Sequence, residues 1–281
     1  LYGTEDVEQI EIVRGPMSAL YGADASGGVI NVITRQPRLG SGLHGGLSLT
    51  YGQSKGKQRE TDLWKAHLEY GGEMLTHRIS VEQRNRDDYH LDRNSYTADL
   101  KGVDETYVNY QGGVQIAPGH KLRLNLERAR QDDSSPSELT RAPFTRFNAY
   151  EREDRDYASV NYTGEIGPGI LVLDAARGKS DAKTTRAYPL IEKTDYTQTQ
   201  YAGRYVLPIG EHTLTLGLGQ QNDQLNIINN TSQEGDRTNN YVLAQGDVRF
   251  NDEWSLLAGV RHDRFNEFGD ATTPRISVQY A

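Results

Sequence analysis

Residues 108–116, VNYQGGVQI, alternate between two kinds of side chain. The even-numbered positions are Val, Tyr, Gly, Val and Ile, and the positions between them are Asn, Gln, Gly and Gln. Because successive side chains of a β-strand point to opposite faces of its sheet, this period of two predicts a strand with one apolar and one polar face. The Ala-Pro-Gly sequence that follows is typical of a tight turn.

The same period of two returns along most of the chain. About twelve such segments can be drawn, each close to the 9–11 residues of a membrane-crossing strand. They include residues 43–51, 64–70, 158–166, 201–207, 214–218, 242–250, 256–262 and 276–280. Short turns alternate with long polar loops, which we expect at residues 52–61, 85–105, 131–155, 179–197 and 222–239. This pattern predicts a mainly β fold, a transmembrane antiparallel β-barrel. A soluble Greek-key β-protein remains the alternative.

Composition and charge placement favour a sheet with one wet face. Only 35% of the 281 residues are hydrophobic and the mean hydropathy is -0.73, yet the chain contains 29 Gly and 17 Tyr. Lys65, Arg123, Arg204 and Arg249 fall in the polar register of their segments. They therefore avoid the cost of about 2–4 kcal/mol for a basic residue that faces lipid at mid-depth.

Tyrosines recur at segment ends, where the aromatic girdle of a membrane barrel is expected. These are Tyr51, Tyr70, Tyr107, Tyr157, Tyr241 and Tyr280. The net charge of -8, without a basic face, argues against a nucleic-acid partner. The absence of cysteine excludes a disulfide framework and a thiolate metal site.

Residues 14–34, RGPMSALYGADASGGVINVIT, are rich in small side chains. Ser26 could be a catalytic nucleophile, but no recognisable histidine motif accompanies it. A phosphate-binding loop would need a Lys after its last Gly, and Val29 stands there instead. Close packing is the better interpretation, because Gly permits backbones to approach one another and to adopt positive φ angles.

Two blocks carry a resemblance to a known family. Residues 7–37, VEQIEIVRGPMSALYGADASGGVINVITRQP, resemble the C-terminal end of the plug domain of TonB-dependent outer-membrane receptors. Residues 241–281 resemble a mid-barrel region of the same family, in its catecholate siderophore and colicin I receptor branch. The family fold is a plug inside a barrel of about 22 strands. The resemblance therefore implies an internal fragment, with residues 1–38 as the C-terminal part of an α/β plug domain and residues 39–281 as the N-terminal portion of the barrel.

The resemblance also implies a function. It predicts TonB-dependent uptake of a ferric siderophore, of catecholate type, across the outer membrane of a Gram-negative bacterium, without covalent chemistry or a resident cofactor. The implied partners are TonB with its energising proteins, through a segment upstream of Leu1, together with outer-membrane lipid, colicins or phage. A receptor for cobalamin, haem or another nutrient is the alternative. A passive porin is disfavoured, because porins lack a plug.

Candidate site residues fall into two groups. Arg14 matches the plug arginine that is thought to pair with barrel carboxylates, and the expected plug–barrel contact residues are Arg14, Gly15, Pro16, Tyr21, Gly22, Gly27 and Gly28. The loops at 131–155 and 85–105 interleave cations and aromatics, which suit an anionic aromatic chelate. Their candidates are Arg141, Phe144, Arg146, Phe147, Tyr150 and Arg152, with Arg84, Arg86 and Tyr89. Ordinary solvated residues paired with neighbouring carboxylates remain the alternative, and no metal site is expected.

Overall fold

The computed structural model describes residues 3–15, 25, 27–54, 59–92, 95–138, 146–185, 191–229 and 231–280. A short 3₁₀ helix, η1 (Thr4–Asp6), leads into a two-stranded antiparallel sheet of β1 (Val7–Arg14) and β2 (Gly28–Thr34). All other strands belong to one second sheet. No helix among the described residues is long and apolar enough to span a membrane.

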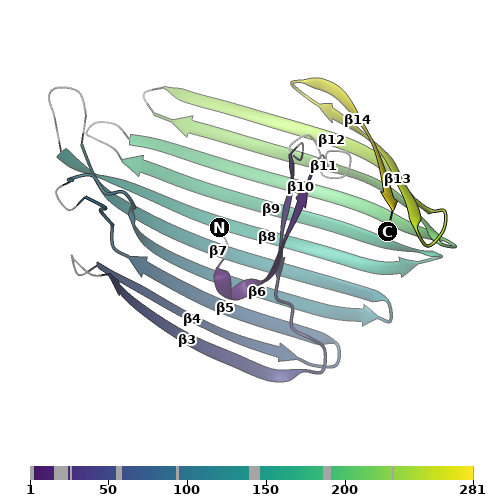
Figure 1. Ribbon diagram of the computed structural model, residues 1–281, viewed down its shortest axis with the longest axis horizontal. Helices are drawn as coiled ribbons and strands as arrows, with labels where there is room; N and C mark the ends of the chain where they lie inside the picture. The colour runs from purple at the N-terminus through teal and green to yellow at the C-terminus, as the bar shows by residue number, and fades with distance from the viewer. Residues whose placement is uncertain are drawn as a thin grey trace.

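The second sheet contains twelve antiparallel strands in simple sequence order, each hydrogen-bonded to the next (Figure 1). This confirms the mainly β class and the number of barrel strands expected from the periodicity. The strands are β3 (Gly42–Ser54), β4 (Arg59–Gly71), β5 (Leu75–Arg86), β6 (Gly102–Ala117), β7 (His120–Glu138), β8 (Arg146–Ile166), β9 (Gly169–Thr185), β10 (Ile191–Ile209), β11 (His212–Ile228), β12 (Ser232–Arg249), β13 (Trp254–Phe265) and β14 (Gly269–Tyr280).

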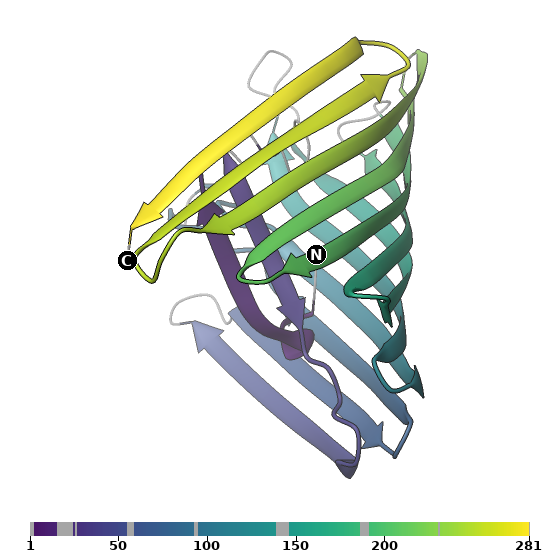
Figure 2. The ribbon, with the colours of Figure 1, turned by 90° about the vertical axis from the view of Figure 1, so that its right-hand side faces the viewer.

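The twelve-stranded sheet curls around the two-stranded one (Figure 2). η1 contacts β5 on the concave face. Residues directly opposite one another on neighbouring strands point to the same face, so the residues paired with these β5 contacts also point inward. The convex face is apolar: Leu49 is 74% exposed and Ile276 is 77% exposed. Most buried residues, in contrast, are polar or charged. Apolar side chains outside and polar ones inside are the arrangement of a membrane barrel with a wet lumen.

The register shows that three of the six tyrosines expected in a lipid-facing girdle face the interior instead. Tyr107, Tyr157 and Tyr241 lie on the concave face, in register rows one position away from the convex Val108, Ala158 and Val242. The convex face carries a different aromatic belt close to the short turns. Its members are Tyr70, Tyr162, Tyr205, Trp254 and Tyr280. The place of a residue at the end of a segment does not decide which face its side chain occupies. Successive side chains alternate between the two faces, so the face depends on whether the residue is an odd or an even number of positions from a residue of known orientation.

Much of the expected long loops is strand. β7 continues to Glu138 and β8 begins at Arg146, so most of the loop expected at residues 131–155 continues the β7–β8 ladder. The same is true of the loops expected at 179–197 and 222–239. Outside the hydrocarbon layer both faces of a strand meet water, so polar residues on both faces carry no penalty. The alternating signal disappears there although the backbone pairing continues.

Candidate functional site

Four alternate residues of β5 face the concave side, and the first three of them meet the N-terminal segment. Arg78, Ser80, Glu82 and Arg84 share one face because side chains of a strand repeat every second residue. The first three are almost fully buried, and Glu82 is only 2% exposed. η1 covers this row, so the plug-side segment and the wall are joined by charged and hydroxyl groups.

Asp6 is the acceptor at the centre of this contact. The Ser80 hydroxyl donates to Asp6 Oδ1 at 2.6 Å, and Arg78 Nε donates to the same oxygen at 3.3 Å. Arg78 Nη1 also donates to Glu69 Oε2 at 2.8 Å, which ties the pair to β4. A buried charge is tolerated only when it is paired and hydrogen-bonded, and these contacts supply both conditions.

Glu82 forms the second half of the contact. The Thr4 hydroxyl donates to Glu82 Oε2 at 3.1 Å, and Lys65 Nζ lies 3.9 Å from the same oxygen. Arg84 bridges Glu82 at 3.4 Å and Glu105 at 3.1 Å. We call Thr4, Asp6, Arg78, Ser80 and Glu82 the η1 latch.

A second polar region occupies the concave face of β8–β10. Arg155 donates to both oxygens of Glu153, at 2.6 and 2.8 Å, and Ser180 donates to Glu153 at 2.6 Å. A cavity of about 440 Å³ adjoins this group and is also lined by Tyr157 and Tyr196. The cavity thus combines a fixed guanidinium with phenol rings.

Asp223 anchors the neighbouring wall. It accepts from Tyr196 and Gln198, each at 2.8 Å, and from Arg237 at 2.7 Å. Burial alone would raise the pKa of Asp223, but the hydrogen bonds, those of Gln198 and Arg237 foremost, outweigh burial and lower it. Burial and the Asp223 carboxylate raise the pKa of Tyr196 to about 12, so this phenol stays a neutral donor at physiological pH.

Further along the concave face, Asp263 and Tyr241 fix the position of Arg261. Its guanidinium donates to Asp263 at 2.7 Å and lies 3.7 Å from the centre of the Tyr241 ring. Asn239 donates to the same carboxylate at 2.8 Å. In the part of the chain that the structure describes, no group of three or more His, Asp or Glu could hold a metal ion. The wall therefore offers hydrogen bonds, charge and aromatic surface to a ligand.

Comparison with known protein families places the chain. The family model of the TonB-dependent receptor-like β-barrel matches residues 36–281, which is most of the chain. The chain belongs to the TonB-dependent receptor family. The model of the TonB-dependent receptor plug domain also matches, over residues 2–29. The chain is therefore part of a transporter and receptor family of the Gram-negative outer membrane.

Individual relatives are distant and longer. The chain is 24% identical over 293 aligned residues to the iron-regulated outer membrane virulence protein of Vibrio cholerae, covering 96% of this chain and 41% of that protein. It is also 24% identical to the vitamin B12 transporter BtuB of Photobacterium profundum, covering 98% of this chain and 43% of that protein. The chain thus spans less than half the length of these curated TonB-dependent relatives.

A solved structure of the family shares the fold. The ferric enterobactin receptor PfeA of Pseudomonas aeruginosa, a G324V mutant, superposes with a TM-score of 0.82 at 21% identity. The match covers 98% of this chain and 46% of PfeA. At this identity the likeness concerns the arrangement of strands.

The register separates the expected ligand residues of this TonB-dependent wall into two sets. Arg84, Arg86 and Phe147 share the concave rows. Arg146, Tyr150 and Arg152 occupy the convex rows of β8, and Tyr89 forms an isolated bridge with Leu100. Arg141 and Phe144 lie outside the described residues. Proximity in sequence therefore does not make the interleaved cations and aromatics one site.

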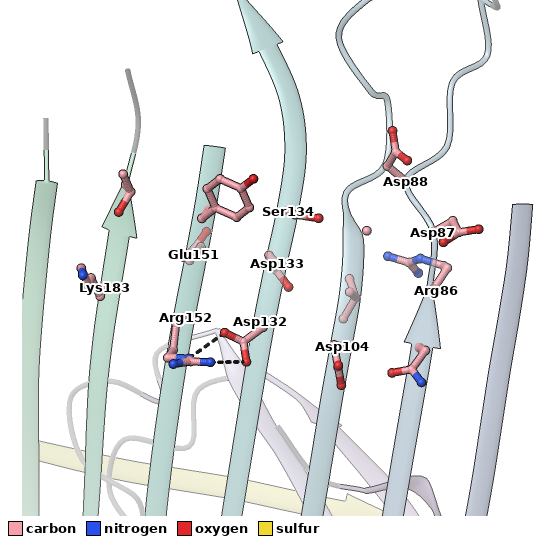
Figure 3. Close-up of a pocket in the computed structure, with 15 residues that line it drawn as sticks. Arg86, Asp87, Asp88, Asp104, Asp132, Asp133, Ser134, Glu151, Arg152 and Lys183 are labelled. Carbon is pink, nitrogen blue, oxygen red and sulfur yellow. Dashed lines mark hydrogen bonds and ion pairs between the residues drawn. The ribbon is translucent and has the colours of Figure 1, made fainter. Parts of the chain in front are cut away.

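A groove of about 600 Å³ is lined by two of the convex candidates, Tyr150 and Arg152, and also by Arg86 (Figure 3). Asp104, Asp132, Arg152 and Lys183 are successive partners across β6–β9. Arg152 donates two hydrogen bonds to Asp132, at 2.7 and 3.0 Å, and this pairing raises its pKa further. Six carboxylates and three cations line this groove, a larger excess of acids than at the cavity near Arg155, which three carboxylates and two cations line.

The expected plug contacts are also divided. Arg14, Gly15, Gly27 and Gly28 are described, whereas Pro16, Tyr21 and Gly22 lie outside the described residues. Arg14 is exposed and forms no ion pair with any described residue. Gly28 has φ +142°, and a Cβ there would collide with the carbonyl oxygen of Val13, so the interpretation of this segment as close packing holds at this position.

Sequence reasoning missed the η1 latch. Thr4 and Asp6 stand in a short polar run without a recognisable motif, and their partners are more than 70 residues away along the chain. One available signal was the alternate Arg-Ser-Glu-Arg series on β5, which is more highly charged than the inner face of an ordinary barrel strand requires. Its charges needed partners, and the N-terminal segment supplies them.

Proposed function

We propose that this chain is part of a receptor for TonB-energised uptake of a ferric siderophore of catecholate type. In this proposal, residues 1–38 are the end of the plug and residues 39–281 are the first part of the barrel. TonB acts on a plug segment that precedes Leu1, and colicins or phage are further candidate partners at the outer rim. The transported iron chelate is the cargo, and no resident cofactor is required.

The observation that carries the proposal is the concave cavity at Arg155. A ferric catecholate is an anion built from aromatic rings, so it gains from a guanidinium and from neighbouring phenols at the same time. Arg155 is already oriented by Glu153, and Tyr157 and Tyr196 line the same cavity. Such fixed groups lose little conformational entropy when a ligand binds.

We assign ligand contacts on the basis of the face that each residue occupies. Arg84, Arg86 and Phe147 are proposed contacts because they share the concave rows with Arg155. Tyr89, Arg141 and Phe144 remain proposed contacts at the rim. Arg146, Tyr150 and Arg152 face away from the lumen, so in this proposal they can meet a ligand only before it enters.

The proposal is tested by measuring ligand binding to the full-length receptor through the change in its tryptophan fluorescence. Ferric enterobactin is expected to bind, and Arg155→Gln is expected to weaken binding about tenfold, the value of one charge-assisted contact. Arg130→Gln is the matched control, since Arg130 pairs with Asp154 in the row next to that of Arg155 but lies on the convex face. Tight binding of cobalamin or haem, without binding of ferric catecholates, would contradict the proposal.

A cobalamin receptor is the second candidate. The observation in its favour is that BtuB of Photobacterium profundum aligns over 98% of this chain at the same 24% identity as the iron-regulated protein. Cobalamin is bulkier and does not carry the charge of a ferric catecholate, so its binding should not depend on Arg155. The Arg155→Gln variant therefore distinguishes the two candidates.

A further inference from the structure

The cavity at Arg155 is lined by a carboxamide, the side chain of Gln198. Gln198 lies on the concave face of β10, directly opposite Asp223 of β11. On the other side of β10 it is opposite Gly178 of β9, which is in turn opposite Tyr157 of β8. Because Gly178 has no side chain, Tyr157 and Gln198 stand on the two sides of an open gap in the cavity floor.

Asp223 determines which end of this carboxamide faces the cavity. Gln198 Nε2 donates to Asp223 Oδ1 at 2.8 Å and to the Tyr196 hydroxyl at 3.1 Å. Asp223 is paired with Arg237 at 2.7 Å, so it is a carboxylate and has no hydrogen to donate. The opposite orientation would set the carbonyl oxygen of Gln198 against this carboxylate. The NH₂ end of Gln198 therefore points to Asp223, and its carbonyl oxygen, Oε1, points away.

Two kinds of polar atom remain for a ligand in this cavity. Gln198 Oε1 accepts a hydrogen bond from no residue in the described part of the chain. Arg155 uses Nε and Nη2 for Glu153, and its Nη1 donates to no described residue. The Tyr196 hydroxyl donates to Asp223 and accepts from Gln198, so Tyr196 offers its ring. The cavity thus combines a cationic donor with a neutral acceptor.

The three acids that line the cavity do not replace this neutral acceptor. Glu153 is paired with Arg155, and Glu127 accepts from a neighbouring amide. Asp156 belongs to a convex register row. A carboxylate repels an anionic ligand, whereas a carbonyl oxygen accepts a hydrogen bond without carrying a full negative charge. A donor group on an anionic ligand is therefore best placed against Gln198.

We propose that Gln198 is a specificity-determining residue, which favours ferric catecholates that carry an N–H group beside the chelating rings. The anionic rings lie near Arg155 and the phenol rings, and the N–H donates to Gln198 Oε1. A ligand that lacks this donor takes water from the carbonyl oxygen without replacing its hydrogen bond, which weakens binding. This inference rests on the proposed uptake of a ferric catecholate, and it adds the feature of the ligand that the wall recognises.

The test compares the affinity of the full-length receptor for two ferric tris-catecholate chelates, measured by tryptophan fluorescence. One chelate carries secondary amides. In the other, each amide nitrogen is methylated, so the charge is unchanged and the N–H is absent. The parent should bind the N–H chelate about tenfold more tightly, and Gln198→Leu should reduce this preference to less than about twofold. Gln200→Leu is the matched control and should keep the preference, because Gln200 lies on the same face of β10 but lines a different cavity.

Two further variants separate orientation from charge. Asp223→Asn permits the carboxamide to turn, so the preference should fall to less than about threefold although Gln198 is unchanged. Arg155→Gln should weaken the binding of both chelates and keep their ratio. Heat-modifiable gel mobility shows that each variant is folded.

The outcomes distinguish this inference from the proposed function. Equal affinity of the parent for the two chelates, or an unchanged preference in Gln198→Leu or Asp223→Asn, would overturn the role of Gln198 and leave the proposed function intact. Failure of both chelates to bind the parent would contradict the proposed function, and this inference with it.

Discussion

Single residues of the η1 latch show why a charged interior is stable here. Asp6 and Glu82 are buried, yet each accepts hydrogen bonds from more than one donor. Removing one partner of such a pair leaves the other charge buried and unpaired, which costs more than the pair contributes. Substitutions in the latch should therefore act locally and strongly.

Asp6→Asn is expected to loosen η1 from the wall. Arg78 keeps its ion pair with Glu69, so the loss of the Asp6 carboxylate is expected to cost about 1.5–3 kcal/mol, which corresponds to opening that is at least about tenfold more frequent. Hydrogen exchange of residues 4–14 in the full-length receptor measures this opening. Asp62→Asn, an exposed convex carboxylate of β4, is the control and should leave exchange of η1 unchanged. Equal protection in both variants would contradict the role of the latch.

Gly28→Ala is expected to destabilise the β1–β2 pair. The residue combines a positive φ with a close approach to Val13, so a side chain there costs about 1–3 kcal/mol. Gly27→Ala is the matched control, because a Cβ at Gly27 meets no atom within 4 Å and its φ is not positive. Limited proteolysis of the full-length receptor compares the two variants. Similar cleavage rates would show that the two glycines are equivalent.

The lowered pKa of Asp223 predicts that the stability of the fold depends on pH in the acid range. Its pKa is lower in the folded chain than in the unfolded chain, so its stabilising contribution is complete above the unfolded value of about 3.9 and is lost as the pH falls through the folded value. Asp223→Asn should therefore lower the melting temperature at pH 7, and the effect should shrink as the pH falls below the unfolded value. A melting difference that stays constant over this pH range would contradict this assignment.

At the scale of elements, the sequence predicts faces better than lengths. The alternation in residues 108–116 correctly indicates a strand of β6, because burial in lipid on one side forces apolar residues into every second position. The outer part of β8 carries no such pattern, since both of its faces meet water, and it was expected to be a loop. The η1 latch depends on contacts distant in sequence, which a local pattern does not encode.

The assignment of faces predicts that a charge destabilises the barrel in a convex register row but not in the adjacent concave row. Leu124→Arg places a charge on the lipid-facing side of β7 and is expected to destabilise the barrel by about 2–4 kcal/mol. Ser159→Arg is the control, because Ser159 belongs to a concave row and lines an inner cavity of about 350 Å³. The folding yield of each variant in lipid vesicles, determined from its gel mobility, measures both effects. Equal folding yields would contradict the assignment.

At the scale of the whole molecule, one sheet separates two environments. Its convex face is largely apolar, and its concave face holds the η1 latch and the cavity at Arg155. β3 and β14 are the edges of this sheet among the described strands. A bilayer tolerates only closed barrels, so in the membrane each of these edges must be hydrogen-bonded to another strand.

The most direct test of this two-sided wall is a spin-label scan of residues 158–163 on β8 in the full-length receptor, reconstituted in vesicles. Labels at 158, 160 and 162 should be relaxed by oxygen dissolved in lipid, and labels at 159, 161 and 163 by a water-soluble nickel chelate. Alternation with this phase supports a convex face that meets lipid and a concave face that meets water. The opposite phase, or no alternation, would contradict the account.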